Sequence, residues 1–129
     1  MGAIEGFEDL IAWKRARELS MEISQITNSG KLNLGFSLKD HMRRTSGSIM
    51  DNIAEGFEGN GYKEFKQFLS ISKGSSGELK SQLYRCLDQN YIDESKFKKL
   101  YYKIDEVSKM LSGLIRYLVN SNYKGYKFG

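Results

Sequence analysis

Apolar residues recur every three or four positions through four long segments of the chain, and such spacing predicts amphipathic helices. The segments cover residues 7–28, 37–57, 62–90 and 94–121. The fourth segment carries the heptad seam of left-handed helix packing. Its apolar positions are Phe97, Leu100, Ile104, Val107, Leu111, Leu114 and Leu118. No strand pattern competes, so the sequence predicts an all-α fold, an antiparallel up-down-up-down four-helix bundle.

Residues 45–61, TSGSIMDNIAEGFEGNG, form the stretch against which we expect the rest of the chain to pack. Ile49, Ile53 and Gly56 share one helix face there, and a glycine cluster ends the helix. Asn52 lies at the edge of this face, where an unpaired amide is costly to bury. We therefore expect a polar anchor between the second and third helices; the alternative is a solvated asparagine. Its predicted members are Asn52, Glu55, Ser75, Ser76 and Glu78.

The third segment has a core line from Phe65 to Cys86 whose middle, SISKGSSGEL, contains mainly small residues. Glycine in a helix costs about 1 kcal/mol, so we expect another element to approach closely there. The alternative is a break into two short helices, although the apolar period continues in phase. Ile71, Gly74 and Glu78 fall away from the core line and indicate a second surface. Ile71, Gly74 and Gly77 are the predicted oligomer contacts.

Local signals predict where the helices begin. Glu8 and Asp9 suit the first turn of the first helix. Ser37 with Asp40 predicts a capping box for the second helix, and Asp93 is the expected cap of the fourth. We expect Leu32 and Leu34 to cover one end of the bundle and Trp13 to lie in the core. Residues 1–122 are predicted to form a single domain, with 123–129 as a mobile tail.

Composition agrees with one globular domain of 129 residues, since 40% of the residues are hydrophobic, 28% are charged and none is proline. No apolar run approaches the ~20 residues that a membrane span needs, and the N-terminus lacks the pattern of a signal peptide. Cys86 is the only cysteine, which excludes an internal disulfide and fits a reducing compartment. We expect a cytoplasmic protein with no membrane partner.

Catalytic chemistry finds little support in the sequence. His41 and Cys86 are the only residues of their types, so one chain cannot assemble a zinc site of the usual ligands. There is no P-loop, and the GSSG stretch lies inside a predicted helix. Glu55 and Glu78 lack the Glu-x-x-His partners of di-iron bundles. We expect a non-enzymatic protein without a metal or cofactor.

Positive charge is concentrated in the second half of the chain, where residues 61–129 carry +6 against a total of +4. Lys66, Lys73 and Lys80 follow heptad spacing along one flank of the third helix. Such a line is either a solvated helix face or a surface for a polyanion, and repetition in an oligomer favours the second. The candidate nucleic-acid-binding residues are Lys66, Lys73, Lys80, Arg43, Arg44, Lys98, Lys109 and Arg116.

Three phrases of the sequence resemble a known family: FEDLIAWKRARELS, SIMDNIAEGF and FLSISKGSSGELKSQL. The family is the bacterial four helix bundle proteins named for reading frames in intervening sequences of large-subunit ribosomal RNA genes. The resemblance covers residues 7–119, and the NIAEG phrase together with GSxxEL makes it fairly specific. Two features depart from the family pattern: Lys73, where an arginine is more usual, and the glycine-rich GFEGNGY connection. Neither threatens the fold.

The resemblance implies an antiparallel bundle that assembles into a ring-like homopentamer. It also implies kinship with the accessory variability protein of diversity-generating retroelements, which binds a reverse transcriptase and nucleic acid. Two functions stay open from the sequence. One is an accessory or scaffold protein associated with RNA or single-stranded DNA, and the other is a purely structural ring that docks a protein partner.

Overall fold

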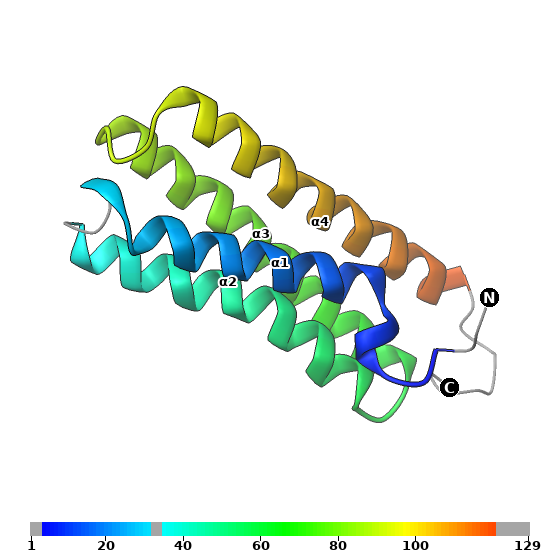
Figure 1. Ribbon diagram of the computed structural model, residues 1–129. Coiled ribbons are helices and arrows are strands. Elements are labelled where there is room, and N and C mark those ends of the chain that lie inside the picture. Colours follow the sequence, from blue (N-terminus) through cyan, green and yellow to red (C-terminus); the bar gives the residue numbers. More distant parts are fainter. Residues whose placement is uncertain (1–3, 32–34, 121–129) are drawn as a thin grey trace.

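The computed structural model describes residues 4–31 and 35–120 and consists of four long α-helices after a short 3₁₀ turn, η1, at Phe7–Asp9. The helices are α1 (Ile11–Thr27), α2 (Phe36–Phe57), α3 (Tyr62–Asp88) and α4 (Glu94–Asn120). Each helix packs along its neighbours in chain order, and α4 closes the bundle against α1 (Figure 1). The described residues contain no strand. The all-α prediction is confirmed.

The core lies between the apolar stripes of the four helices, as their periodicity predicts. Every position of the α4 seam faces the core, although Phe97 and Leu114 are only half-buried at its edge. Trp13 is also half-buried, with its ring 5.0 Å from that of Phe7. Fully buried large side chains come from all four helices: Leu19, Ile23, Met42, Ile49, Ile53, Phe57, Phe65, Leu69, Leu79, Leu83 and Leu100.

Gly56 of α2 lies close against α3. Gly56 is buried, and a Cβ atom placed on it would lie 2.6 Å from the Cβ of Phe68 and 3.0 Å from the Cδ1 of Phe65. Phe57 and Phe65 then pack edge to face, with ring centroids 5.8 Å apart. The absent side chain of Gly56 therefore sets the distance between the two helices at this end.

The small-residue stretch of α3 does not break the helix, so the alternative of two short helices is wrong. Its two sides differ in what they contact. Ser72 and Ser76 are fully buried, and the hydroxyl of Ser72 donates to the carbonyl of Ile49 on α2 at 2.6 Å. Gly74 and Gly77 are exposed, and a Cβ on either would meet no atom within 4 Å. The expected close approach is confirmed for the serines, but the chain's own packing does not require the two glycines.

Two predicted helix starts need correction. A 3₁₀ turn precedes α1 because the Asp9 carboxylate accepts the N–H groups of Glu5 and Gly6, at 2.9 and 3.3 Å, and Leu10 is extended. These hydrogen bonds hold the pKa of Asp9 below its usual value. The helix therefore begins at Ile11, four residues later than predicted.

The capping box predicted for α2 is wrong. The helix begins at Phe36 with Gly35 as its N-cap, so Ser37 already lies inside the first turn and no side chain caps the helix. Asp40 pairs instead with Arg44, one turn further along, at 3.4 Å. The predicted cap of α4 is confirmed, because the Asp93 carboxylate accepts the N–H of Lys96 at 2.7 Å. Leu32, Leu34 and the predicted tail lie outside the described residues.

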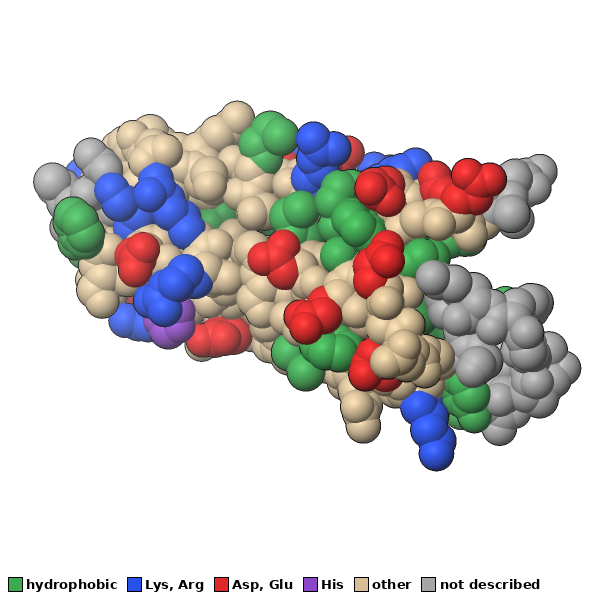
Figure 2. All heavy atoms as spheres, turned by 90° about the horizontal axis from the view of Figure 1, so that it is seen from below, with side chains coloured by type: hydrophobic (Ala, Val, Ile, Leu, Met, Phe, Trp, Pro, Cys, Tyr) green, Lys and Arg blue, Asp and Glu red, His purple; other side chains and the backbone are tan. Residues whose placement is uncertain are grey.

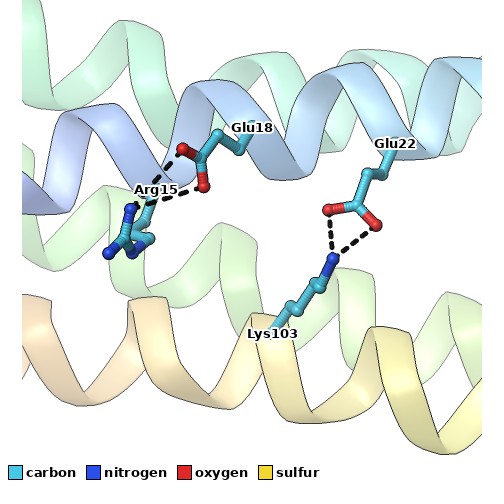
Figure 3. Close-up of polar contacts among 4 residues, drawn as sticks. All are labelled: Arg15, Glu18, Glu22 and Lys103. Atoms are coloured by element: carbon cyan, nitrogen blue, oxygen red, sulfur yellow. Dashed lines mark hydrogen bonds and ion pairs between the residues drawn. The ribbon is translucent and has the colours of Figure 1, made fainter.

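Two contacts between a lysine and a carboxylate join neighbouring helices. Lys103 of α4 reaches both carboxylate oxygens of Glu22 on α1, at 2.7 and 2.6 Å, whereas Arg15 and Glu18 pair within α1 (Figure 3). Lys80 of α3 donates to Asp105 of α4 at 2.8 Å. The hydrogen bond from Lys80, followed by that from Lys109, lowers the pKa of Asp105. Asp105 therefore remains ionised and ties α3 to α4.

Replacing Gly56 with alanine should destabilise the bundle, because the new methyl group overlaps Phe68. We expect the free energy of unfolding to fall by about 1–3 kcal/mol, measured by chemical denaturation. The matched control is Gly47→Ala in the same helix, where a Cβ meets no atom within 4 Å. This change should raise the free energy of unfolding by about 0.5–1 kcal/mol, through helix propensity alone. Equal effects of the two substitutions would contradict the close approach.

Asp105→Asn should lower the melting temperature at neutral pH and flatten the acid dependence of stability. A carboxyl group whose pKa is depressed on folding stabilises the native state above its unfolded pKa, near 3.8, and loses that contribution as the pH falls toward the folded value. Thermal melts between pH 7 and pH 2 measure both effects. Asp40→Asn is the control, because the exposed pair with Arg44 should contribute little. Identical pH profiles for Asp105→Asn and the wild-type protein would contradict a stabilising role for the contact between Lys80 and Asp105.

Candidate assembly and nucleic-acid surfaces

The outer face of α3 brings the three predicted oligomer contacts together. Ile71, Gly74 and Gly77 follow one another at intervals of three residues, so they lie along one stripe of the helix. All three are exposed, and the side chain of Ile71 is 52% accessible. The two glycines leave the backbone uncovered beside this apolar side chain. The stripe is therefore shaped for the close approach of another helix or backbone.

The predicted polar anchor is assembled differently from the expectation. Asn52 donates to the carbonyl and to the hydroxyl of Ser48 in its own helix, at 2.8 and 3.0 Å. Ser48 in turn lies 3.1 Å from the hydroxyl of Ser75 on α3. Direct contact of Asn52 with α3 is therefore wrong as a prediction, and so is a solvated asparagine. Ser48 mediates the link, and its place one turn before Asn52 was the signal available in the sequence.

The remaining members of the anchor do not meet one another. The Glu55 carboxylate is exposed and makes no hydrogen bond or ion pair with another described residue. Ser76 donates to the carbonyl of Lys73 in its own helix at 2.6 Å. Glu78 does reach α2, but through His41, whose Nε2 lies 3.2 Å from its carboxylate.

The antiparallel register explains this outcome. Ile49 of α2 lies opposite Ser72 of α3, and Met42 lies opposite Cys86. Glu55 therefore lies beside the start of α3, away from Glu78. Spacing within each helix predicts its faces but not this register, which depends on the length and path of the connection.

Gln82 is a buried polar residue that the sequence analysis missed. Its amide donates to the hydroxyl of Thr45 at 3.0 Å, and that hydroxyl donates to the carbonyl of His41 at 2.9 Å. The Oε1 atom of Gln82 is buried without a hydrogen-bond partner among the described residues. Gln82 occupies a core position of the α3 period, and that spacing was the only available signal.

The two candidate arginines of α2 are both engaged in contacts within the chain, and one of them joins two helices. Arg43 donates through Nε to the hydroxyl of Thr27 at 2.9 Å and through Nη2 to the side-chain carbonyl of Asn28. It therefore fastens the end of α1 to α2. Arg44 is exposed and pairs with Asp40. Neither guanidinium is a free cation held ready for a phosphate.

The lysine line of α3 contains three different environments. The ammonium of Lys66 lies 5.4 Å from the ring centroid of Tyr62. Lys73 is exposed and forms no ion pair with a described residue. The side chain of Lys80 is only 22% accessible and is paired with Asp105. The charge of Lys80 is therefore already paired within the bundle, and its part in binding a polyanion stays a prediction.

The cations predicted on α4 are also mostly paired. Lys98 lies 3.3 Å from Glu94, and Lys109 lies 3.1 Å from Asp105. Arg116 is exposed. On the face seen in Figure 2, basic side chains gather at the end that holds the histidine, and acidic side chains follow along the middle. The eight candidate residues are thus spread over three helices, and they do not form one continuous basic face.

Catalytic groups are not brought together in the part of the chain that the structure describes. No three of its histidine, cysteine and acidic side chains lie close enough to hold a metal ion. Cys86 is buried beside Met42, and desolvation raises the pKa of its thiol to about 11. The thiol is therefore protonated and unreactive at neutral pH. None of the described helices has the length and apolar character of a membrane span.

Comparison with known proteins supports the fold and identifies the family. A crystal structure of a protein of unknown function from Bacteroides thetaiotaomicron, described as a member of the S23 ribosomal protein family, superposes with a TM-score of 0.77. It is 19% identical in sequence, and the match covers 82% of this chain and 96% of the other. No curated protein matches the chain. The family model described as 23S rRNA-intervening sequence protein matches residues 8–113, so the chain belongs to that family.

Proposed function

We propose that this chain is a non-enzymatic scaffold that works as a homo-oligomer, with the outer stripe of α3 as its subunit contact. The observation that carries the proposal is the pair of exposed glycines, Gly74 and Gly77, which no contact among the described residues requires. Each costs about 1 kcal/mol relative to alanine in a helix interior. An interface that needs close backbone approach accounts for that cost, as it does for the exposed Ile71.

A ring is the assembly we favour, and the homopentamer implied by the family resemblance is its proposed form. A contact between the α3 stripe and a different surface of the next subunit is heterologous, and such contacts close into rings when the rotation permits. A non-enzymatic role is supported by the burial of Cys86, whose thiol is protonated at neutral pH, and by the separation of Cys86 from any cluster of metal-ligating groups among the described residues.

Gly74→Tyr tests the subunit contact. The wild-type protein should scatter light as a particle well above 14.8 kDa, and as about five times that mass if the ring is a pentamer. The substitution should shift the population toward the monomer while preserving helicity, because tyrosine is a better helix former than glycine. Lys99→Tyr, at an exposed position of α4, is the control and should leave the mass unchanged. A monomeric wild-type protein at micromolar concentration would overturn the proposal.

Association with RNA or single-stranded DNA is the second candidate function. It is favoured by the exposed Lys73 beside the α3 stripe, which forms no ion pair with a described residue, and by a partly exposed aromatic cluster between α3 and α4. In this cluster Tyr84 lies 4.8 Å from Phe97 and 5.9 Å from Tyr101, measured between ring centroids. Aromatic rings and nearby cations are the elements with which proteins hold single strands. Repetition in an oligomer would combine weak contacts. A protein partner, with a reverse transcriptase as the class implied by the resemblance, belongs to the scaffold alternative.

Lys66→Gln together with Lys73→Gln tests nucleic-acid binding and leaves the contact between Lys80 and Asp105 intact. Binding of single-stranded RNA should weaken, and its dependence on salt should become shallower, because each lost phosphate contact removes about 0.7 from the logarithmic slope. Gel shifts at several salt concentrations measure both effects. Lys14→Gln with Arg15→Gln removes the same charge from α1 and should have less effect. If the wild-type protein does not bind at low salt, or both double variants bind equally, the purely structural scaffold takes precedence.

A further inference from the structure

An apolar groove lies at the end of the bundle where α1 begins and α4 ends. The start of α1 and the end of α4 meet at this end in Figure 1. The groove has a volume of about 470 Å³. Its lining includes Ile4, Ile11, Met110, Gly113, Leu114 and Tyr117.

The groove is built from side chains that the bundle leaves uncovered. Ile11 is 59% accessible, Tyr117 is 50% accessible and Ile4 is 43% accessible. Gly113 leaves space at the α4 side, because a Cβ there would meet only the tip of Arg116, at 3.8 Å. Three large apolar side chains around one hollow are an unfavourable surface in water unless another group covers them.

We propose that residues 121–129, SNYKGYKFG, fold back from the end of α4 and place their aromatic side chains in this groove. This segment follows Asn120 directly, and it carries Tyr123, Tyr126 and Phe128 at spacings of two or three. Gly113 lies seven residues before Asn120, about 10 Å along the helix axis at 1.5 Å per residue. Nine extended residues span about 30 Å, so the segment reaches the whole groove even after the chain reverses.

Charge complementarity supports the same occupant. Lys124 and Lys127 alternate with the aromatic residues of the segment, whereas the η1 side of the groove is acidic. Asp9 lines the groove, and the exposed Glu5 and Glu8 lie in the same short stretch. The N–H groups of Glu5 and Gly6 keep Asp9 ionised by lowering its pKa. Apolar side chains would fill the hollow while the two lysines meet its acidic rim.

A cysteine pair tests the proposal in the full-length chain. Gly113→Cys with Tyr126→Cys places one thiol in the groove and one in the segment, and the native Cys86 is buried and unreactive. Under mild oxidation at low protein concentration, we expect a disulfide within one chain. Arg116→Cys with Tyr126→Cys is the matched control, because Arg116 does not line the groove and is closer along the chain to the segment. An undocked segment would therefore reach position 116 at least as readily as position 113.

The proposal predicts disulfide formation about tenfold faster at position 113 than at position 116, because docking raises the effective concentration of one thiol near the other. Changing Lys124 and Lys127 to glutamate should reduce this preference, while circular dichroism shows unchanged helicity. Equal rates at the two positions would overturn the proposal. Cross-linked dimers in place of internal disulfides would also overturn it, because they would show that the groove takes the segment of a second copy.

Discussion

The close approach of α2 and α3 is the constraint on which the rest of the bundle depends. It requires Gly56 to lack a side chain beside Phe68, and it lets Ser72 reach the carbonyl of Ile49. A buried hydroxyl that donates to a helix carbonyl at 2.6 Å holds the backbone of α2 close to α3 at Ser72. Gly56 therefore packs against the start of α3, at Phe65 and Phe68, and the small residues of α3 pack one to two turns earlier on α2, where Ser72 meets Ile49 and Ser75 meets Ser48.

The small residues of α3 lie on two sides of the helix, one packed against α2 and one exposed. Ser72 and Ser76 are buried in the bundle and are explained by the fold, whereas Gly74 and Gly77 are exposed and are not. Glycine on the exposed side of a helix lowers the stability of the helix, and no contact among the described residues compensates for that loss. That cost is the physical reason for placing a subunit contact on α3, and it is independent of the family to which the chain belongs.

Several cations join helices of the bundle, whereas the distribution of charge along the sequence suggests a surface for a polyanion. Arg43 fastens α1 to α2, Lys103 fastens α4 to α1, and Lys80 fastens α3 to α4. These cations stabilise the bundle, so they are not available as a uniform polyanion surface. A nucleic-acid partner would have to rely on the few unpaired cations, on aromatic stacking and on repetition in an oligomer.

The sequence by itself determined the helices, their inward faces and the absence of a break in α3, because periodicity and helix propensity are local properties. The regular seam from Phe97 to Leu118 and the cap at Asp93 were predictable for this reason. Only the tertiary structure decided which polar residues meet. Ser48 contacts Ser75, Glu78 contacts His41 and Lys80 contacts Asp105, and these pairs depend on the register and rotation of the packed helices. The groove between the start of α1 and the end of α4 likewise exists only once the two helices have packed.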